Sequence, residues 1–416
     1  MHTNCLLKIG LFAVFVCIDL NAALKAVVVN PYADVSWAAC GRYKANLHTH
    51  TTESDGNMSP GEVIDAYAGA GCKVLALTDH NKNTWPWSSW GRTPSGVGMI
   101  GISGCEASIH DHLNTLYSDY NGSRPTIEAS ITQAANDGGL AQINHPGRYN
   151  RSVSWYVNLF EQYDNLFGIE VYNQGDRYSG DRELWDDILS RMMPQRPVWG
   201  TSNDDLHRIS HLGRNWQVLL TPGGRLDSVS IRGAIVKGAF YACYDMSGNG
   251  ADVVELDSFE VARGAVRVFA HCAGDSIHWI SDGVDIHQGG EIALSHASLG
   301  SYLRAVIYGN NGARTLTQPI GLDKTVGIAP SPVLTSRSPS VLVRQHSYGA
   351  VQVRSTASSD PILLEFFDLS GRLAGSAKLP NSTCAASVPL ETSNSALIVR
   401  LHTGGHRVVS EIIALR

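Results

Sequence analysis

The segment at residues 43–80 constrains the fold most, because it reads as a strand, a helix and a second strand in succession. Residues 43–47 have the composition of a short strand, and residues 73–78 are apolar and β-prone enough for a buried parallel strand. Between them, Ser59 is placed to cap a helix, with Pro60 at the first position, Glu62 at the capping-box position and Gly71 at the end. A helix that joins two strands in this way is a βαβ unit, which predicts an α/β fold.

Histidines and carboxylates follow both of these predicted strands. His48 and His50 come directly after the first strand, and Asp79 and His80 follow the second. Side chains two residues apart on an extended strand share a face, so His48 and His50 can chelate one ion together. The carboxyl ends of parallel strands are also where α/β sheets and barrels place active sites. One histidine alone would more often be a hydrogen-bonded structural residue, but the cluster, with Asp55 between the strands, favours a metal site.

Short motifs in this segment resemble those of a known family. His48-Thr49-His50, Ser54-Asp55-Gly56 and Thr78-Asp79-His80-Asn81 are similar to the first two motifs of the PHP (polymerase and histidinol phosphatase) domain metallohydrolases. The resemblance extends over about residues 28–245. It implies a distorted (βα)7-type PHP barrel that carries a metal-dependent hydrolase site.

The resemblance continues after the next predicted strand, at residues 99–103. Glu106 follows that strand and resembles the glutamate that bridges two ions in the family, a role open to a carboxylate but not to a histidine. The histidine that comes next in the family corresponds to His112. His110 is the nearby competitor, but His112 directly precedes the apolar run at residues 113–117.

Two later motifs complete the set that the resemblance implies. His145 lies in an Asn-His-Pro sequence after the predicted strand at residues 140–144. The family closes its site with an Asp-x-His motif, which selects Asp205 and His207. Asp204 is the second choice, with a place behind the ligands.

These motifs predict nine metal ligands, which are His48, His50, Asp55, His80, Glu106, His112, His145, Asp205 and His207. Nine exceed the three protein ligands of a single catalytic zinc, so they indicate two or three divalent ions that share carboxylates. Mixed imidazole and carboxylate ligands suit Zn, Mn or Fe. Such ions activate water and neutralise a phosphoryl oxygen, which predicts hydrolysis. We expect Asp79 or an unidentified residue to protonate the leaving group, and Arg148 to bind an oxyanion unless it forms only a surface salt bridge.

Changes in composition predict five segments. Residues 1–26 have the lysine, apolar run and small residues of a secretory signal peptide, and residues 27–250 form the PHP barrel. Short alternating stretches predict a β-sandwich extension at 251–327, followed by a Pro- and Ser-rich linker at 328–340 and a second small β-sandwich at 341–416. The last segment is similar to C-terminal sorting domains of the type IX secretion system, with an ordinary accessory module as the alternative.

Charge and hydropathy narrow the function classes. A net charge of −6 without a basic block argues against nucleic acid as an obligate partner. We expect no transmembrane segment and export to the periplasm, cell surface or extracellular space, with the secretion machinery as a candidate partner of the C-terminal domain. The sequence-based hypothesis is a secreted metal-dependent phosphoesterase with a small phosphorylated or other ester substrate. The alternatives are hydrolysis of a carbamate or other non-phosphate ester, and a surface binding module with a vestigial metal site.

Overall fold

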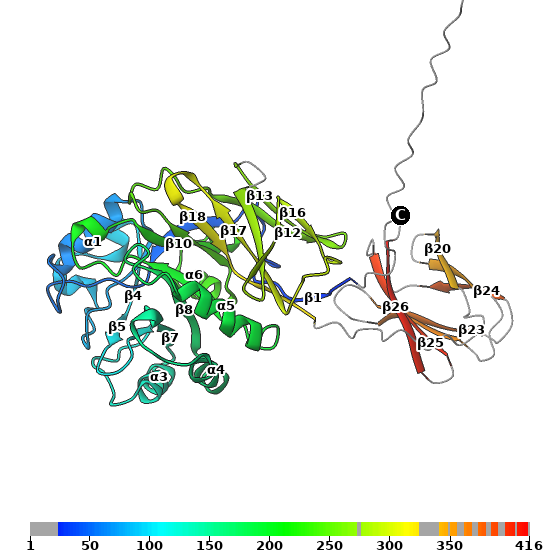
Figure 1. The fold of residues 1–416 in the computed structure, drawn as a ribbon, viewed down its shortest axis with the longest axis horizontal. Coiled ribbons are helices and arrows are strands. Elements are labelled where there is room, and N and C mark those ends of the chain that lie inside the picture. Colours follow the sequence, from blue (N-terminus) through cyan, green and yellow to red (C-terminus); the bar gives the residue numbers. More distant parts are fainter. Residues whose placement is uncertain are drawn as a thin grey trace, which may run out of the picture. The chain divides into compact units, whose positions relative to one another are not determined.

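The computed structural model describes residues 24–272 and 276–323, together with the backbone of the strands between residues 341 and 414. The chain divides into two compact units, residues 1–327 and 328–416. The first unit is a mixed α/β structure with several sheets and few helices (Figure 1). The predicted signal peptide lies largely outside the described residues, and the predicted linker lies outside them entirely.

The α-helices of the described residues are α1 Pro60–Gly69, α2 Pro94–Val97, α3 Ile127–Asn136, α4 Val153–Gln162, α5 Asp181–Met192 and α6 Ser228–Lys237. The predicted capping box of α1 is confirmed, because Ser59 and Glu62 each accept a hydrogen bond from the backbone N–H of the other. Helix α6 ends at Gly238, whose φ of 70° suits glycine. Helix α4 was not predicted. Within the described part of the chain, every helix is too short or too polar to cross a bilayer.

The first sheet has the order β1-β19-β17-β18-β11-β10-β2-β3-β4, with β14 and β15 attached through β17. Its strands are β1 Val27–Val29, β2 Gly41–Asn46, β3 Val74–Ala76, β4 Ile100–Ile102, β10 Asn215–Thr221, β11 Phe240–Tyr244, β14 Ile277–Ser281, β15 Val284–Gln288, β17 Tyr302–Tyr308, β18 Arg314–Thr317 and β19 Ile320–Leu322. Strands β2 and β3 are parallel and joined by α1, so the predicted βαβ unit is confirmed. Strands β10 and β11 are antiparallel insertions beside β2 that were not predicted.

The second sheet has the order β5-β6-β7-β8-β9. Its strands are β5 Gly104–Ala107, β6 Leu113–Leu116, β7 Leu140–Ile143, β8 Leu166–Asn173 and β9 Trp199–Asn203. Strands β5, β6 and β7 pair antiparallel, whereas β7, β8 and β9 pair parallel. Helices α3, α4 and α5 lie on the outer side of this sheet (Figure 1).

The predicted distorted (βα)7-type barrel is not confirmed, because the described strands form open sheets and no closed barrel. Among the described residues, two isolated parallel bridges lie between the two sheets, one between Thr49 and Leu206 and one between His80 and Glu106. Strand β10 occupies the edge of β2 that β9 would need. Strand β4 pairs with β3, whereas β5, which follows β4 after Ser103, meets the end of β3 only at the His80 bridge. The chain also connects β5, β6 and β7 as antiparallel neighbours and not through βα repeats.

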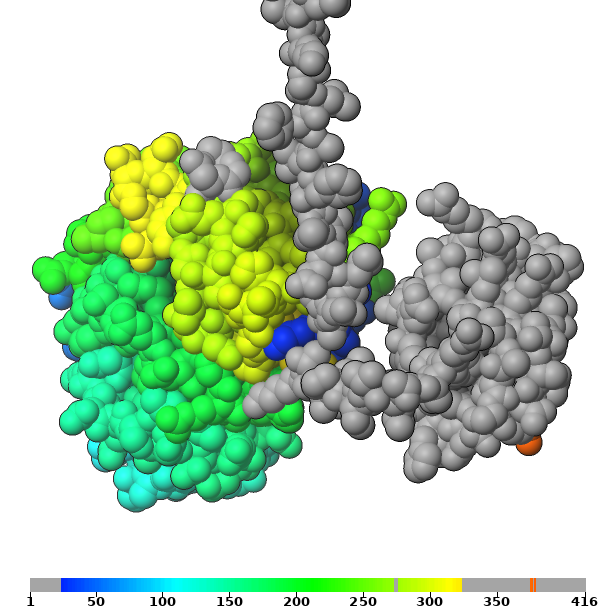
Figure 2. All heavy atoms as spheres, turned by 45° about the vertical axis from the view of Figure 1, so that its right-hand side comes forward, coloured from blue at the N-terminus to red at the C-terminus, as the bar shows by residue number. Residues whose placement is uncertain are grey.

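A third sheet of the first unit consists of β12 Leu256–Ala262, β13 Ala265–Ala270 and β16 Glu291–Ala293. It packs on the first sheet through a buried apolar cluster that includes Phe259, Trp279 and Leu303. Figure 2 shows the atoms of this segment, yellow-green to yellow, in one continuous surface with the green residues before it. Strand β18 pairs directly with β11, so the predicted extension adds strands to the first sheet. The division at residues 250 and 251 stays a prediction.

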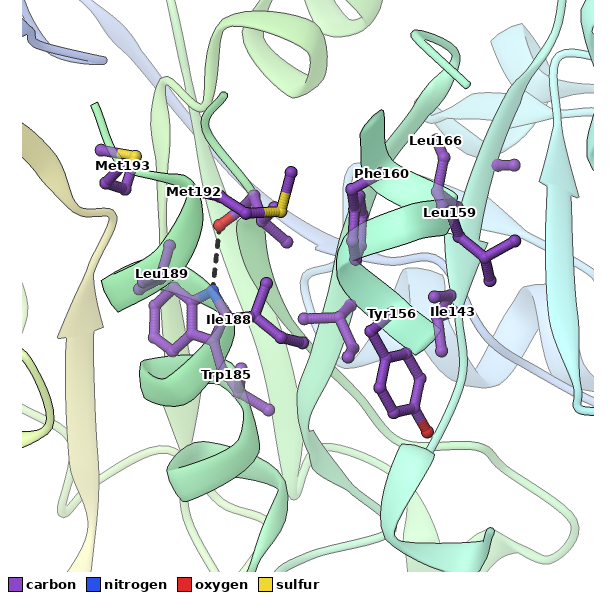
Figure 3. Close-up of a cluster of buried hydrophobic side chains, with 14 of the residues drawn as sticks. Ile143, Tyr156, Leu159, Phe160, Leu166, Trp185, Ile188, Leu189, Met192 and Met193 are labelled. Atoms are coloured by element: carbon purple, nitrogen blue, oxygen red, sulfur yellow. Dashed lines mark hydrogen bonds between the residues drawn. The ribbon is translucent and has the colours of Figure 1, made fainter. Parts of the chain in front are cut away.

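Two further apolar clusters hold the helices and sheets of the first unit together. One lies between the two large sheets and includes Leu47, Leu116 and Phe167. The other lies between the second sheet and its helices, where Phe160 of α4 and Ile188 of α5 lie on facing sides of the cluster (Figure 3). The indole N–H of Trp185 donates to the carbonyl of Val198 at 2.9 Å, so this large ring is buried without an unsatisfied donor.

The second unit contains two antiparallel sheets, in the orders β20-β21-β24 and β23-β22-β25-β26. Their strands are β20 Val341–Ser347, β21 Ala350–Ser355, β22 Ile362–Phe367, β23 Leu373–Leu379, β24 Cys384–Pro389, β25 Ala396–Thr403 and β26 His406–Ala414. The antiparallel β character agrees with the prediction for residues 341–416. A sorting role for this unit stays a prediction.

Candidate metal centre

The nine predicted ligands lie together at the end of the two large sheets where the isolated bridges form. On the first sheet they follow β2 and β3 (His48, His50, Asp55 and His80), and on the second they belong to the ends of β5, β6, β7 and β9 (Glu106, His112, His145, Asp205 and His207). Each sheet contributes about half of the set. The centre therefore exists only where the two sheets meet.

His48, His50 and Asp205 form a buried group of ligand atoms. The Nε2 atoms of His48 and His50 lie 3.1 Å apart. Asp205 Oδ1 lies 3.3 Å from His48 Nε2 and 3.1 Å from His50 Nε2. Ligand atoms bound tetrahedrally to one zinc ion at 2.0–2.1 Å lie about 3.3 Å from one another. The spacing of this group is therefore that of atoms around one ion.

Glu106 lies at the middle of the cluster, fully buried, and each of its oxygens faces histidines. Oε1 lies 3.2 Å from His48 Nε2, 3.0 Å from His112 Nδ1 and 3.2 Å from His145 Nε2. Oε2 lies 2.7 Å from His80 Nδ1. One carboxylate is thus shared by histidines from β2, β3, β6 and β7. This is the position expected of a bridging ligand.

Asp55, His80 and His207 form the outer group, which is open to solvent. Asp55 Oδ2 lies 3.5 Å from His80 Nε2 and 3.3 Å from His207 Nε2, and the Asp55 side chain is 53% exposed. Gly56 makes this turn fit, because a Cβ there would lie 2.7 Å from the carbonyl carbon of His50. The Ser-Asp-Gly motif therefore brings Asp55 back over the strand end that carries His50.

Hydrogen bonding within the cluster agrees with metal binding. Ligand atoms within 4.8 Å of one another form four overlapping groups, and each of the nine residues belongs to at least one. Glu106 Oε2 and His80 Nδ1 lie 2.7 Å apart and Asp205 Oδ1 lies 3.1 Å from His50 Nε2, but none of these three buried atoms has hydrogen-bond geometry with a described residue. Buried polar atoms without partners are rare in folded proteins. The Glu, Asp and His side chains can therefore hold divalent cations.

The electrostatic field around His48 is strongly negative. Burial lowers the pKa of His48, but Asp205, Glu170 and Glu106 outweigh it and hold that pKa well above its ordinary value. Burial raises the pKa of Glu106, yet the neighbouring His48 and hydrogen bonds from His112 and His145 bring it well below its ordinary value. The Glu106 carboxylate is thus kept ionised, and the same negative field attracts cations.

Glu170, in β8, is a buried carboxylate behind the ligands that sequence analysis missed. It accepts from His48 Nδ1 at 2.9 Å and from the backbone N–H of His145 at 2.8 Å. A carboxylate on the outer nitrogen of a metal-binding histidine fixes the tautomer and the ring orientation. The sequence held one sign of this role, a single glutamate in an otherwise mostly apolar run, which the structure shows as the buried strand β8.

Asp79 does not reach the pocket in which the ligands lie. It is fully buried and accepts from the backbone N–H and hydroxyl of Thr51, at 2.7 and 2.9 Å, and from the hydroxyls of Ser54 and Thr84. These four bonds fix the turn that carries Asp55. These bonds give Asp79 a positioning role, and proton donation by Asp79 stays a prediction.

The two competing residues of the sequence analysis lie away from the ligand atoms. His110 bonds the hydroxyl of Ser130 and the backbone carbonyl of Asp111, whereas His112 faces Glu106. Asp204 accepts from the Tyr67 hydroxyl, and from the backbone N–H groups of Gly213 and Asn215. Burial raises the pKa of Asp204 to about 6. The choice of His112 and Asp205 thus agrees with the geometry.

A pocket of about 740 Å³ opens above the cluster. Its cationic lining residues are Arg148, Arg177 and Arg208, and its neutral polar ones include Asn57, Asn81, Ser108 and Gln174. His211, also in the lining, accepts from Arg208 Nε at 2.9 Å. Arg148 was expected here, and Arg208 and His211 were missed. The pocket is polar, and its lining includes three exposed arginines, which suits an anionic substrate.

This chain has only weak similarity to the known proteins that it matches. No protein-family model and no curated protein matches it. A solved two-domain protein from Bacteroides vulgatus, containing a predicted PHP-like metal-dependent phosphoesterase, covers 94% of this chain and 99% of its own length, at 12% identity and a TM-score of 0.41. An amidohydrolase from Chromobacterium violaceum, with bound sulfate and no metal, covers 39% of this chain and 87% of its own, at 18% identity and a TM-score of 0.33.

A third structure, named as a metal-dependent phosphoesterase from Bifidobacterium adolescentis, covers 47% of this chain and 96% of its own, at 14% identity and a TM-score of 0.35. At these identities and TM-scores, the likenesses establish neither the family nor the activity of this chain. The function has to be inferred from the residues of the centre and its pocket.

Proposed function

We propose that this protein is a metal-dependent phosphoesterase, which hydrolyses a phosphoric mono- or diester at a centre of two or three divalent ions. The observation that carries the proposal is the position of Glu106, which is shared by ligand groups on both sides of the cluster. A shared carboxylate among imidazoles is the ligand pattern of a multinuclear Zn, Mn or Fe centre. The motif resemblance to PHP domains and the arginine-lined pocket support a phosphoester as the substrate.

The ligand groups suggest which residues would hold each ion. His48, His50 and Asp205 would hold one ion together with Glu106. A second ion would be held at Glu106 by His145, which shares a ligand group with His48, or by His112, which shares one with His80. Asp55, His80 and His207 would hold a third, at the more exposed end of the cluster.

The chain's own residues orient this centre and bind the substrate. When bound, the ions supply Lewis acidity, which acidifies water and neutralises charge on a phosphoryl oxygen. Glu170 holds the ring of His48, and Asp79 holds the turn of Asp55. Arg148, three residues after His145 in the same turn, is placed to bind a phosphoryl oxygen at the edge of the centre.

Elemental analysis of the purified protein tests this proposal. We expect two or three equivalents of transition metal in the wild type, a loss approaching one in His207→Ala and a larger loss in Glu106→Gln, because the last removes the shared charge. The exposed Glu161 of α4 offers a matched control, and Glu161→Gln should keep the full complement. Hydrolysis of phosphate esters should fall in both ligand variants.

A wild-type protein that holds less than one equivalent, and that gains no hydrolysis from added Mn²⁺ or Zn²⁺, would overturn the proposal. Metal-loaded protein that cleaves carbamates or carboxylic esters, but no phosphoester, would instead support the non-phosphate hydrolase. Metal-free protein that binds a surface ligand would support the binding module.

We further propose that the protein is exported and that residues 341–416 direct its sorting. The signal-peptide pattern of residues 1–26 and the sorting-domain resemblance of residues 341–416 support this. A chain that ends at Pro330 should then keep its hydrolytic activity and lose export or surface attachment. Loss of folding or hydrolysis in that shorter chain would make the second unit structural, and normal export would end the sorting hypothesis.

A further inference from the structure

The pocket above the centre has more positive charge than one phosphoryl group needs. Its carboxylates are Asp55, Glu106 and Asp205, and all three belong to the ligand groups. With divalent ions bound, these carboxylates are neutralised, and the guanidinium groups of Arg148, Arg177 and Arg208 remain. A volume of about 740 Å³ falls within the ~300–1,000 Å³ of small-molecule pockets, so there is room for a substrate that reaches beyond the ions.

These three arginines also lack the partners that other arginines of the chain have. Arg151, Arg182 and Arg304 are each paired with an aspartate. Within the described residues, no carboxylate oxygen lies within ion-pair distance of Arg148, Arg177 or Arg208. Arginines that converge on one pocket without an internal counterion are available to an anionic ligand.

Arg208 is held by a hydrogen bond that leaves both Nη groups of its guanidinium as donors for a ligand. Its Nε donates to His211 Nε2 at 2.9 Å, and its two terminal nitrogens form no hydrogen bond with described residues. The guanidinium is therefore anchored through its stem-side nitrogen while both Nη groups remain donors. This is the geometry that bidentate binding of a phosphate or carboxylate requires.

Arg177 is connected through Gln174 to the loop after β9, which carries Arg208. Gln174 follows β8 and Asp205 follows β9, and these strands are parallel neighbours. The side-chain amide of Gln174 donates to the carbonyl of Asp205 at 3.1 Å and accepts from Arg177 Nη1 at 3.4 Å. Arg177 and Arg208 thus stand on adjacent loops that one glutamine ties together. Arg148 stands on the loop after β7, which is the parallel neighbour of β8 on its other side.

We infer that Arg177 and Arg208 form a second anion-binding subsite, and that the substrate is an organic phosphoester with a second anionic group, a phosphate or a carboxylate. This inference rests on the proposed phosphoesterase function. Arg148 remains with the scissile phosphoryl group, and the subsite on the β8 and β9 loops selects substrates by their second charge.

Substrate pairs that differ in one charge test the subsite. Alkanediol bisphosphates of increasing chain length would be compared with the corresponding alkanediol monophosphates on the metal-loaded protein, as the ratio of their kcat/KM values. We expect at least one bisphosphate to exceed its monophosphate about tenfold, which corresponds to about 1.4 kcal/mol. Arg208→Gln and Arg177→Gln should each reduce this ratio severalfold.

A binding measurement separates failure of the subsite from failure of the proposed function. Non-hydrolysable alkane bisphosphonates and monophosphonates would be titrated calorimetrically into the same protein and variants. Arg225, exposed and without an ion pair, gives the matched control Arg225→Gln, in which both ratios should equal those of the wild type. Tighter bisphosphonate binding that is lost in Arg208→Gln supports the subsite even when no ester is cleaved.

The inference would be overturned if the monophosphates are cleaved as fast as every bisphosphate and both arginine variants keep the wild-type ratio of kcat/KM values. The proposed phosphoesterase function would be unaffected by that result. A bisphosphate preference that survives in Arg177→Gln and Arg208→Gln would also overturn the inference, because the ions or Arg148 would then account for the preference. Absence of hydrolysis of all phosphoesters refutes the proposed function itself.

Discussion

The Glu170→Gln substitution is expected to weaken metal binding without changing any ligand. Oε1 of Glu170 accepts from His48 Nδ1 and Asn203 Nδ2 at 2.9 Å each. Oε2 accepts from the His145 N–H at 2.8 Å and from Asn173 Nδ2 at 2.9 Å. A carboxylate satisfies all four donors, whereas a glutamine amide puts a donor of its own at one of the two oxygen positions.

The neighbouring amides determine where the new nitrogen lies. Asn203 Oδ1 already accepts from the Leu47 N–H at 2.8 Å and from Gln217 Nε2 at 3.0 Å, so Asn203 cannot turn over without losing both bonds. Asn173 Oδ1 has no hydrogen-bond partner among the described residues, so Asn173 can rotate and accept from the new amide. The nitrogen should therefore lie beside Asn173 and leave the His145 N–H without an acceptor.

The size of the effect follows from this loss. A buried N–H without an acceptor costs about 1–3 kcal/mol of stability. Removal of a carboxylate behind a metal-binding histidine typically lowers metal affinity about 10–100-fold. We expect both effects in Glu170→Gln, and neither in Glu161→Gln, whose side chain is exposed on α4.

Competition with a chromogenic chelator measures the zinc affinity, and urea unfolding of the metal-free protein measures the stability. Metal affinity and unfolding free energy that both equal those of the wild type would show that His48 and His145 keep their positions without the carboxylate. The reasoning about Glu170 would then be refuted.

Three further outcomes are expected. Arg148→Ala should keep the metal content and lower kcat/KM for a phosphoester at least about tenfold. An unchanged kcat/KM would mean that Arg148 does not bind the substrate. Burial raises the pKa of Asp181 to about 7 from an ordinary 3.8, so the native state keeps a proton that the unfolded chain releases. The free energy of unfolding should therefore fall between about pH 4 and pH 7, by at most ~1.4 kcal/mol per pH unit. Urea unfolding across this pH range should show the fall in the wild type but not in Asp181→Asn. The same pH dependence of the unfolding free energy in both proteins would contradict this. Ser59→Ala should lower the unfolding free energy by about 1 kcal/mol, by loss of the α1 cap, with metal content unchanged; an equally stable variant would mean that the cap contributes little.

Local features were predictable from the sequence because their signals lie within a few residues. The capping box of α1, the end of α6 at Gly238 and the placement of histidines after β2 and β3 all depend on neighbours in the chain. The clustering of His48, His50 and His80 followed from the rule that parallel strands end at a common edge. The ligands Glu106, His112, His145, Asp205 and His207 came from the resemblance of their motifs to those of PHP domains. Local patterns of this kind survive tertiary packing.

Features that depend on distant pairing were not predictable in this way. Whether β9 pairs with β2 depends on β10, a strand about 170 residues after β2, which takes that edge. The direction of the Asp79 side chain depends on Thr51, Ser54 and Thr84, so the motif showed the residue type but not its role. Arg208 and His211 became relevant only when their loop was placed over the centre.

The two isolated bridges between the sheets have a consequence for amide exchange. At the seam, each sheet supplies part of the same ligand set, and the backbone contributes the bridges of Thr49 with Leu206 and His80 with Glu106 together with the hydrogen bond from the Asn57 N–H to the His207 carbonyl. Divalent ions would add cross-links between the two sheets there, and ion binding would raise the free energy of opening. The His50 N–H, which donates to the Leu206 carbonyl at 2.9 Å across the seam, becomes a native reporter. Its exchange rate should follow metal occupancy while amides inside β8 remain protected.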